Sequence, residues 1–250
     1  MSLTPSAVIL VIPCYNEQAR LDLPAIRSAL TNMPWLRLLF ANDGSSDGTA
    51  DLLETIMQTY PGRVQVETLL HNQGKAEAIR LGALQALNWG HSDFIGYWDA
   101  DFAVPLIDLE YFVWFAGPNH RHLDLIIGSR VRRLGADIQR LFWRHYLGRV
   151  FATIASLLLR LPVYDTQCGA KLIATRNVNQ IFQSPFISRW IFDVEVLARM
   201  NAIGQQRGRP PEVLEVPLKA WKEQGGSKVK AKHFAQALLE ICLIAWRYSR

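Results

Sequence analysis

The sequence predicts an α/β fold in which a mostly parallel central sheet is flanked by helices. Short apolar runs rich in Val, Ile and Leu alternate along the first hundred residues with segments of helical apolar spacing. Continuous apolar runs are typical of parallel strands buried on both faces, and their alternation with helices is typical of βαβ units. The 250 residues contain no repeat, low-complexity tract or linker, so we expect a single domain.

The first half of the chain contains three strand–helix units and a fourth strand. The strands are expected at residues 7–13, 36–41, 64–70 and 93–98, and the third helix at residues 75–89. The second helix is predicted by the helical spacing of Leu52, Leu53, Ile56 and Met57.

The second half has a less regular order, which includes a stretch rich in arginine from residue 130 to residue 149. Helices are expected at residues 106–115, 141–161 and 234–246, and another one opens at residues 189–195. Strands are expected at residues 122–128 and 171–175, with an edge strand at residues 212–217.

The long helix at residues 141–161 allows two interpretations. Arg144 and Arg149 interrupt its first half, which argues against a membrane span. The helix therefore either packs against the core or lies in a membrane interface, where aromatic residues beside arginines suit the headgroup region.

Composition excludes some classes of protein. The formal net charge of +5 is a modest basic bias, which suits phosphates or an anionic membrane surface. Without a dense basic run or a recognisable binding module, we expect no nucleic-acid partner. The three cysteines lack metal-ligand spacing and are expected to be buried free thiols in a reducing compartment. No signal peptide is expected at the N-terminus.

Three polar clusters follow predicted strands: residues 13–17, 42–47 and 99–101. Ligands of parallel α/β sheets bind beyond the carboxyl ends of the strands, so these clusters should converge on one crevice. Asp99 and Asp101 are one residue apart, and paired carboxylates suit Mg²⁺ or Mn²⁺ together with substrate phosphates. The alternative is a strand exit with two solvated or capping carboxylates.

These residues carry a family resemblance. The motifs Pro13–Glu17, Asn42–Thr49, Gly74–Lys75 and Asp99–Asp101 together resemble inverting glycosyltransferase family 2 with its GT-A fold. Further motifs look like the polyprenyl-phosphate sugar synthases, and among these more like dolichyl-phosphate β-glucosyltransferase than mannose synthase. They are Gly128–Arg130, Asp165–Leu172, Arg189–Glu195, and Trp221 before Gly226–Val229.

The sequence departs from the family pattern in three places. Asn42 stands where the family often has Asp, and an amide still pairs with a nucleobase edge. Ala103 stands where mannose synthases carry a metal-binding Gln, which leaves fewer protein ligands. The membrane anchor common in the glucosyltransferase relatives is not seen, so attachment is expected to be peripheral.

The resemblance implies transfer of a sugar, with glucose favoured, from a nucleotide-diphospho-sugar such as UDP-glucose to a polyprenyl or dolichyl phosphate, with inversion. We expect residues 1–230 to form the GT-A catalytic domain. Residues 231–250 should form an amphipathic helix at the membrane interface, packed on or continuing that domain. The location expected is the cytoplasmic face of a membrane.

Residue roles follow from the resemblance. A metal, Mg²⁺ or Mn²⁺, is assigned to Asp99 and Asp101, and catalysis to Asp101, Asp193 and Arg130. The acceptor phosphate is assigned to Arg130, Arg144 and Lys228. The donor is assigned to Pro13, Tyr15, Glu17, Asn42, Asp43, Lys75 and Asp99.

Bland alternatives stand beside these roles. The cations could be solvated surface residues, and Glu17 and Asp43 could serve the turns alone. Asp193 could cap a helix; of Asp193 and Glu195, one should enter the site and the other cap or pair with Arg189.

Other functions also stay open. They are transfer from GDP-mannose, transfer to a soluble acceptor, and a non-catalytic nucleotide-sugar-binding or membrane-scaffolding role. The segment 130–139 is expected to be mobile until acceptor binds.

Overall fold

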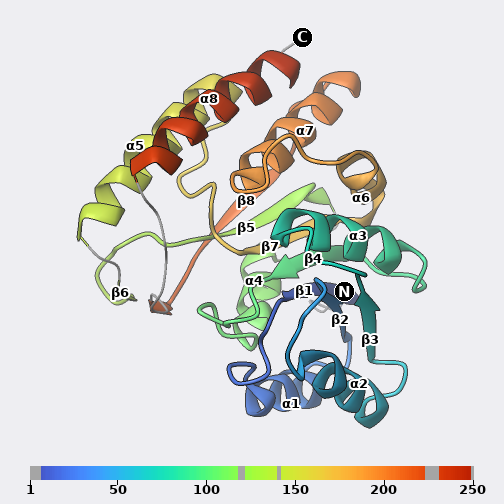
Figure 1. The fold of residues 1–250 in the computed structure, drawn as a ribbon. Helices are drawn as coiled ribbons and strands as arrows, with labels where there is room; N and C mark the ends of the chain where they lie inside the picture. The colour runs from blue at the N-terminus through green and yellow to red at the C-terminus, as the bar shows by residue number, and fades with distance from the viewer. Residues whose placement is uncertain (1–6, 118–121, 140–141, 223–230, 249–250) are drawn as a thin grey trace.

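The computed structural model describes residues 7–117, 122–139, 142–222 and 231–248, without the side chains of residues 142–147 and 231–235. One seven-stranded sheet crosses the molecule (Figure 1). Its strands are β1 (Val8–Cys14), β2 (Leu36–Asn42), β3 (Val64–Thr68), β4 (Phe94–Trp98), β5 (Leu125–Ser129), β7 (Ala170–Ala174) and β8 (Val213–Pro217). Their order is β3-β2-β1-β4-β7-β5-β8, and only β7 runs antiparallel to its neighbours.

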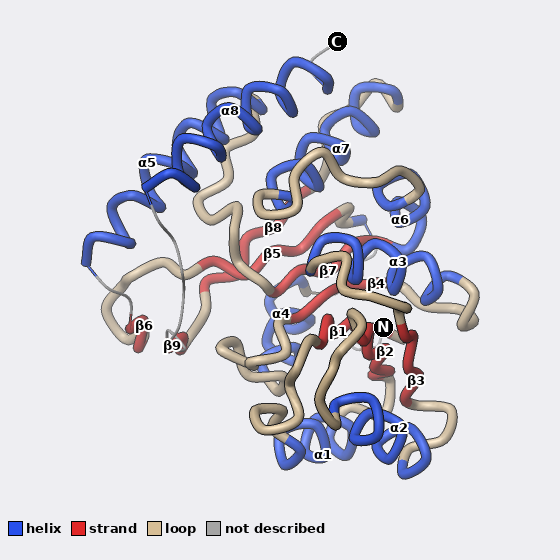
Figure 2. Tube along the Cα trace, in the orientation of Figure 1, coloured by secondary structure: helices blue, strands red, loops and turns tan. Residues whose placement is uncertain are grey.

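Helices cover both faces of the sheet, as Figure 2 shows. One face packs against α1 (Leu23–Asn32), α2 (Thr49–Thr59) and α4 (Asp108–Ala116). The other packs against α3 (Lys75–Leu87), α6 (Thr175–Phe182) and α7 (Phe192–Gln206). Beyond α7 lie α5 (Phe142–Leu159) and α8 (Ala231–Tyr248), which contact each other and α7.

Strand residues alternate between the two cores. Ile9 and Val11 of β1 face the α3 side, whereas Leu10 and Ile12 face the α1 side, and all four are fully buried. A strand that is buried on both faces has no polar face, so its sequence is a continuous apolar run. The predicted α/β fold with a mostly parallel sheet is therefore confirmed.

The predicted elements are present, with ends displaced by a few residues. The strand expected from residue 122 begins at Leu125, and the helix expected to open at residues 189–195 begins at Phe192. Helix α6 and a small parallel pair of strands, β6 (Asp137–Gln139) and β9 (Ala220–Lys222), were not predicted. The segment 130–139, which was expected to be mobile until acceptor binds, thus ends in strand β6, which pairs with β9.

The interpretation of the long helix as packing against the core is confirmed for one side of α5, and its placement in a membrane interface stays a prediction. Phe151, Ala155 and Leu159 are buried in the core, whereas Leu157 is 73% exposed. Within the described residues, no helix combines the length and apolarity that a membrane crossing requires.

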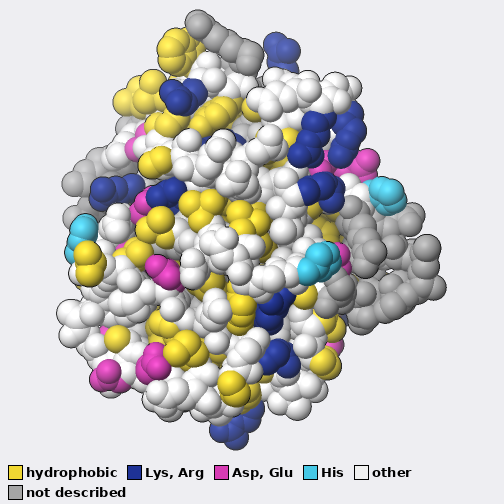
Figure 3. All heavy atoms as spheres, turned by 90° about the vertical axis from the view of Figure 1, so that its right-hand side faces the viewer, with side chains coloured by type: hydrophobic (Ala, Val, Ile, Leu, Met, Phe, Trp, Pro, Cys, Tyr) yellow, Lys and Arg dark blue, Asp and Glu magenta, His cyan; other side chains and the backbone are white. Residues whose placement is uncertain are grey.

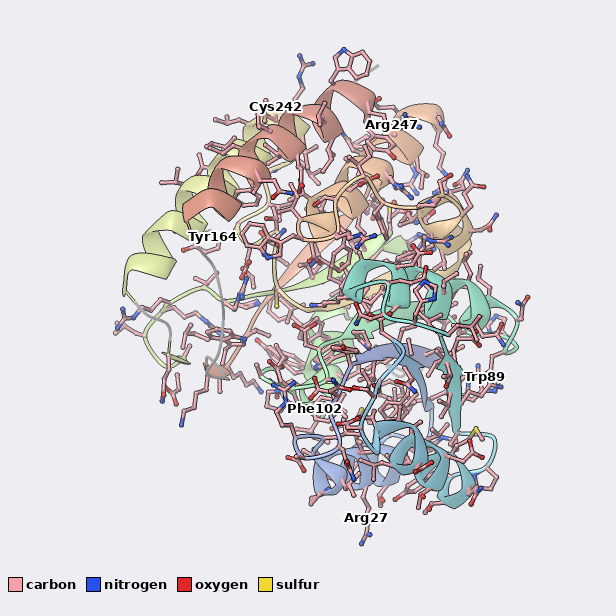
Figure 4. All side chains as sticks on the ribbon, in the orientation of Figure 1. Arg27, Trp89, Phe102, Tyr164, Cys242 and Arg247 are labelled. Carbon is pink, nitrogen blue, oxygen red and sulfur yellow. The ribbon has the colours of Figure 1, made fainter. Side chains whose placement is uncertain are left out.

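The expectation that all three cysteines are buried free thiols can be compared with the structure. Cys14 and Cys168 are buried free thiols as predicted, but that prediction was wrong for Cys242, which is exposed on α8 (Figure 4). Burial of an amphipathic helix covers only one of its sides, and Cys242 lies on the other. On the face drawn in Figure 3, Lys and Arg side chains form separate groups among apolar and uncharged ones.

Candidate active site

A pocket of about 340 Å³ opens at the carboxyl ends of β1, β2 and β4, where the three polar clusters converge as predicted. This size lies at the lower end of the range of about 300–1,000 Å³ that is usual for ligand sites. Its lining residues come from the end of β1, four loops and the start of α3: Pro13, Cys14, Tyr15, Glu17, Arg20, Asp43, Asn72, Gly74, Lys75, Asp99, Ala100 and Asp101.

The turn after β1 places Glu17 in this pocket. The backbone N–H of Glu17 donates to Oγ1 of Thr49 at 2.8 Å, which joins the turn to the start of α2. One carboxylate oxygen of Glu17 pairs with Arg20 at 2.7 Å, and the other, Oε2, is buried without a hydrogen-bond partner. Burial raises the pKa of Glu17, although Arg20 opposes the shift. An unpartnered buried oxygen in a pocket marks a place for a ligand donor.

Asp43, after β2, shapes the pocket wall. Its two carboxylate oxygens accept hydrogen bonds from the backbone of Gln73 at 2.7 Å and Gly74 at 2.8 Å. Asp43 therefore fixes the loop that leads into α3. Asn42 is buried, accepts a hydrogen bond from the backbone of Ser45 at 3.2 Å and does not line the pocket.

Lys75 begins α3 and reaches across the pocket to the carboxylates after β4. Gly74 precedes it with φ of 94°, a conformation that favours glycine. The ammonium of Lys75 lies 2.5 Å from Oδ1 of Asp99. Burial alone would lower the pKa of Lys75, but the charges of Asp99 and then of Asp193 outweigh burial and raise it. Lys75 is therefore a cation inside the site.

Asp99 and Asp101 lie at the carboxyl end of β4, on a tight turn. The N–H of Asp99 donates to the carbonyl of Gly169 at 3.1 Å, and Oδ1 of Asp101 accepts from the N–H of Ala103 at 3.0 Å. Phe102, labelled in Figure 4, completes the turn with φ of 44°, which is unusual for a bulky residue. Burial, together with the charge of Asp99, raises the pKa of Asp101.

The two carboxylates fit a divalent ion. Both line the pocket, and oxygen is the ligand atom that Mg²⁺ and Mn²⁺ prefer. Among the described residues, no group of three or more His, Cys, Asp and Glu side chains is arranged to hold a metal. An ion bound by this pair would therefore take its other ligands from a substrate phosphate or water.

Arg130 follows β5 and forms a bidentate pair with Asp165. The Nε atom lies 2.7 Å from Oδ2 of Asp165, and Nη2 lies 2.8 Å from Oδ1. The guanidinium also lies over the Trp221 ring, 5.3 Å from its centroid. Arg130 does not line the pocket, but it is close enough to Asp99 for that charge to act on it. Burial alone would lower the pKa of Arg130, and Asp165 and other acidic groups, including Asp99, raise it.

Glu215 on β8 holds the loop that carries Asp165. Its two oxygens accept hydrogen bonds from the backbone of Tyr164 at 2.7 Å and Asp165 at 2.9 Å. Arg149 of α5 stacks on the Tyr164 ring at 3.4 Å, and Figure 4 shows Tyr164 below α5. Helix α5 is thus linked through this loop to Arg130.

Asp193, at the start of α7, is buried rather than open to the pocket. Its Oδ1 accepts a hydrogen bond from the Tyr97 hydroxyl at 2.6 Å and pairs with the Lys171 ammonium at 2.5 Å. Burial and the charge of Asp193 raise the pKa of Tyr97 far above its ordinary value, so Tyr97 stays a neutral donor. The charge of Asp193 is compensated by Lys171 and also helps to raise the pKa of Lys75, so Asp193 acts on the pocket through its neighbours rather than by lining it.

Glu195 corrects one expectation. It pairs with Arg199 at 2.7 Å rather than with Arg189, because residues four apart on a helix lie on the same face. It also accepts hydrogen bonds from the Ile187 backbone and the Tyr248 hydroxyl, so it joins α7 to α8.

Some assigned residues fall outside this description, and some residues near the site were not predicted. Lys228 and the side chain of Arg144 lie outside the described residues, so their roles stay predictions. Arg20, Asp165 and Lys171 were not assigned roles. Lys171 could have been found as the one charged residue within the apolar strand β7, since a charge there requires a buried partner.

The sequence pattern of glycosyl transferase family 2 matches residues 9–178. The chain belongs to glycosyl transferase family 2. As a member of this family, it is a glycosyltransferase. The matched region contains all but the first residue of β1, then β2 to β7, and with them the whole pocket.

Similar glycosyltransferases cover most of the chain. The dolichyl-phosphate beta-glucosyltransferase of Mus musculus is 31% identical over 88% of this chain and 68% of its own length. Dolichyl-phosphate beta-glucosyltransferase ALG5C of Trichomonas vaginalis is 28% identical over 94% of this chain and 69% of its own.

Solved structures of other synthases have a similar fold. Mannosyl-3-phosphoglycerate synthase from Rubrobacter xylanophilus has a TM-score of 0.69 at 15% identity and covers 96% of this chain and 74% of its own. Glucosyl-3-phosphoglycerate synthase from Mycobacterium tuberculosis, in complex with Mn²⁺, UDP-glucose and phosphoglyceric acid, has a TM-score of 0.65 at 13% identity, with 96% and 80% covered. At such identities the likeness confirms the GT-A fold.

Proposed function

We propose that this glycosyltransferase moves glucose from UDP-glucose to dolichyl phosphate, with inversion at the anomeric carbon. The observation that carries the proposal is the pocket formed by Asp99, Asp101 and Lys75 in a chain whose relatives are dolichyl-phosphate beta-glucosyltransferases at 28–31% identity. A pocket that combines two carboxylates with a cation suits a nucleotide diphosphate and a divalent ion better than a neutral ligand.

The donor would occupy the pocket with its diphosphate near Lys75. Asp99 and Asp101 would hold Mg²⁺ or Mn²⁺, which as a Lewis acid neutralises charge on the leaving diphosphate. Glu17, with its unpartnered Oε2, supplies an acceptor for a nucleoside hydroxyl. Asp43 serves the donor indirectly, since its oxygens already fix the loop before Lys75.

The acceptor needs no strong base. A phosphate monoester has a second pKa of about 6, so a lipid phosphate is largely a dianion at neutral pH and attacks directly. This agrees with Asp193, whose charge is already compensated by Lys171 and which is placed to hold Tyr97 rather than to take a proton. Of the three cations assigned to the acceptor phosphate, Arg130 is the one whose side chain is described. Its guanidinium is already paired with Asp165 through Nε and Nη2, so the phosphate would have to share or replace that pair.

Peripheral contact with the cytoplasmic face of a membrane completes the proposal. Helices α5 and α8 expose apolar side chains on the side away from the core, and a basic protein with such helices suits an anionic lipid surface. These side chains are Val150, Leu157, Leu158, Leu239, Leu243 and Trp246.

Liposome flotation tests the membrane contact. The double variant Leu239→Ser/Leu243→Ser should bind vesicles of anionic lipid more weakly than the natural protein. Leu70→Ser is the matched control, because Leu70 is 99% exposed on the loop that follows β3, the strand at the edge of the sheet away from α5 and α8 (Figure 1). Equal vesicle binding by the double variant would contradict the proposed surface.

Transfer of radiolabelled sugar tests the reaction itself. UDP-glucose and GDP-mannose are supplied separately with dolichyl phosphate in detergent, with and without EDTA. We expect glucose in the lipid phase and its loss with EDTA. Mannose transfer alone would contradict the sugar and the donor, and transfer only to a soluble acceptor would contradict the lipid phosphate.

A further inference from the structure

The nearest partner of the Asp99 carboxylate is an ammonium group of the protein itself. Nζ of Lys75 lies 2.5 Å from Oδ1 of Asp99, at one of the carboxylates that the proposed function assigns to the divalent ion. Oδ1 is buried and, although the ammonium lies close to it, no hydrogen bond of ordinary geometry satisfies it, so either the ammonium or a metal ion can take this oxygen. The divalent ion and the Lys75 ammonium therefore compete for Oδ1 of Asp99.

The position of Lys75 is built into the fold. Asp43 accepts a hydrogen bond from the N–H of Gly74 at 2.8 Å, which fixes the backbone where α3 begins. The ammonium also lies over the Phe192 ring, 5.9 Å from its centroid, so an aromatic face supports the cation from the side of α7. The ion pair is thus held by two elements and is more than a chance surface contact.

We propose that Lys75 is the resident counter-ion of Asp99 and competes with the divalent ion until the donor diphosphate draws the ammonium away. The inference rests on the proposed function, because it takes the metal and the diphosphate as ligands of this pocket. Metal alone would then bind weakly, and metal and nucleotide would each strengthen binding of the other. Lys75 couples the two ligands because its ammonium leaves the Asp99 carboxylate when it binds the diphosphate, which frees that carboxylate for the metal.

The size of the effect follows from the exposure of the pair. The side chains of Lys75 and Asp99 are 40% and 37% exposed. Partly exposed ion pairs are worth up to about 1 kcal/mol, which corresponds to a factor of about five in a binding constant. Removing the charge of Lys75 should therefore tighten Mn²⁺ binding by about fivefold when no nucleotide is present.

Mn²⁺ binding without nucleotide is the test. The paramagnetic resonance signal of free Mn²⁺ is followed during titration of the natural protein, Lys75→Met and Lys75→Arg. Lys75→Met should bind Mn²⁺ about fivefold more tightly, and Lys75→Arg, which keeps a cation, should stay close to the natural protein. Arg27→Met is the control for net charge, because Arg27 points away from the pocket, beneath α1 (Figure 4).

UDP affinity with and without Mn²⁺ gives a second readout. In the natural protein, Mn²⁺ should strengthen UDP binding by a larger factor than in Lys75→Met. The variant has no ammonium at Asp99 that the diphosphate must first draw away, so in the variant the two ligands are not coupled through residue 75. The same ratio must appear in the Mn²⁺ titrations, since coupling between two ligands is reciprocal. UDP binding with Mn²⁺ present should be weaker in Lys75→Met, which lacks the diphosphate contact.

Three results would overturn the inference. They are unchanged or weaker Mn²⁺ binding in Lys75→Met, equal tightening in Arg27→Met, and no Mn²⁺ binding in Lys75→Met at any concentration the protein tolerates. Circular dichroism establishes that each variant is folded. Failure of the proposed function has a different signature: Lys75→Met tightens Mn²⁺ binding while the natural protein transfers no glucose to dolichyl phosphate.

Discussion

Replacing Gly169 with alanine should disable the site while leaving the domain folded. Gly169 precedes β7, and its carbonyl accepts the N–H of Asp99 at 3.1 Å, next to the β4–β7 pairing of Trp98 with Ala170. A Cβ at Gly169 would lie 2.1 Å from Oδ2 and 2.3 Å from Cγ of Asp99. The backbone cannot withdraw without breaking that hydrogen bond, so the carboxylate has to move.

The structure sets the size of this displacement. Ordinary van der Waals contact begins at 3.4 Å, so Oδ2 of Asp99 must shift by about 1.3 Å. A misplacement of about 1 Å can cost roughly a hundredfold in rate, which is ~2.7 kcal/mol in the activation barrier. We expect kcat to fall by about that factor and Mn²⁺ affinity in the presence of UDP to fall with it.

The assay is glucose transfer at saturating donor and metal, combined with Mn²⁺ titration and thermal unfolding. Gly48→Ala is the matched control: its Cβ would lie 2.5 Å from the amide of Gln18, the far end of an exposed side chain that can rotate away. This control should keep most of its activity. A folded Gly169→Ala protein with natural kcat and Mn²⁺ affinity would refute the reasoning, because Asp99 would then not need its present position.

Four further changes test other parts of the site. Asp101→Ala should abolish turnover without unfolding the domain, and undiminished activity would remove the metal role from that residue. Since burial raises the pKa of Asp101 and the charged form binds the metal, Mn²⁺ affinity should decline on acidification from a pH above the ordinary aspartate range of about 3.9, as titration across pH would reveal. Arg130→Met should raise KM for dolichyl phosphate at unchanged KM for UDP-glucose, whereas equal changes in both would argue for a merely structural Arg130–Asp165 pair. Lys171→Met should lower the free energy of unfolding by about 3–5 kcal/mol, since Asp193 is left as an unpaired buried charge; in urea denaturation, Lys171→Met/Asp193→Asn should recover part of this loss.

Local patterns in the chain were enough to predict the helices, the strands and the edge of the sheet where the site lies. Buried parallel strands are apolar throughout, so the run before Asp99 identified β4 without any knowledge of its neighbours. The polar clusters at Glu17, Asp43 and Asp101 follow the ends of parallel strands, and the carboxyl ends of such strands lie at one edge by geometry.

The short elements escaped prediction for a physical reason. Strands β6 and β9 have three residues each and exist because they pair with each other, although they are distant in sequence. A three-residue segment carries too little periodicity to be recognised, and its conformation is decided by its partner. Insertion of β7 antiparallel between β4 and β5 is likewise a result of sheet assembly.

By itself, the sequence determined the α/β fold, the family motifs and which carboxylates follow β4. Only the tertiary structure decided the partners of the charged groups: Lys75 with Asp99, Arg130 with Asp165, and Lys171 with Asp193. Secondary structure follows from the spacing of apolar residues within one segment, which can be read along the chain. Charge pairing depends on which side chains the packed sheet brings within a few ångströms, and that distance is a property of the fold as a whole.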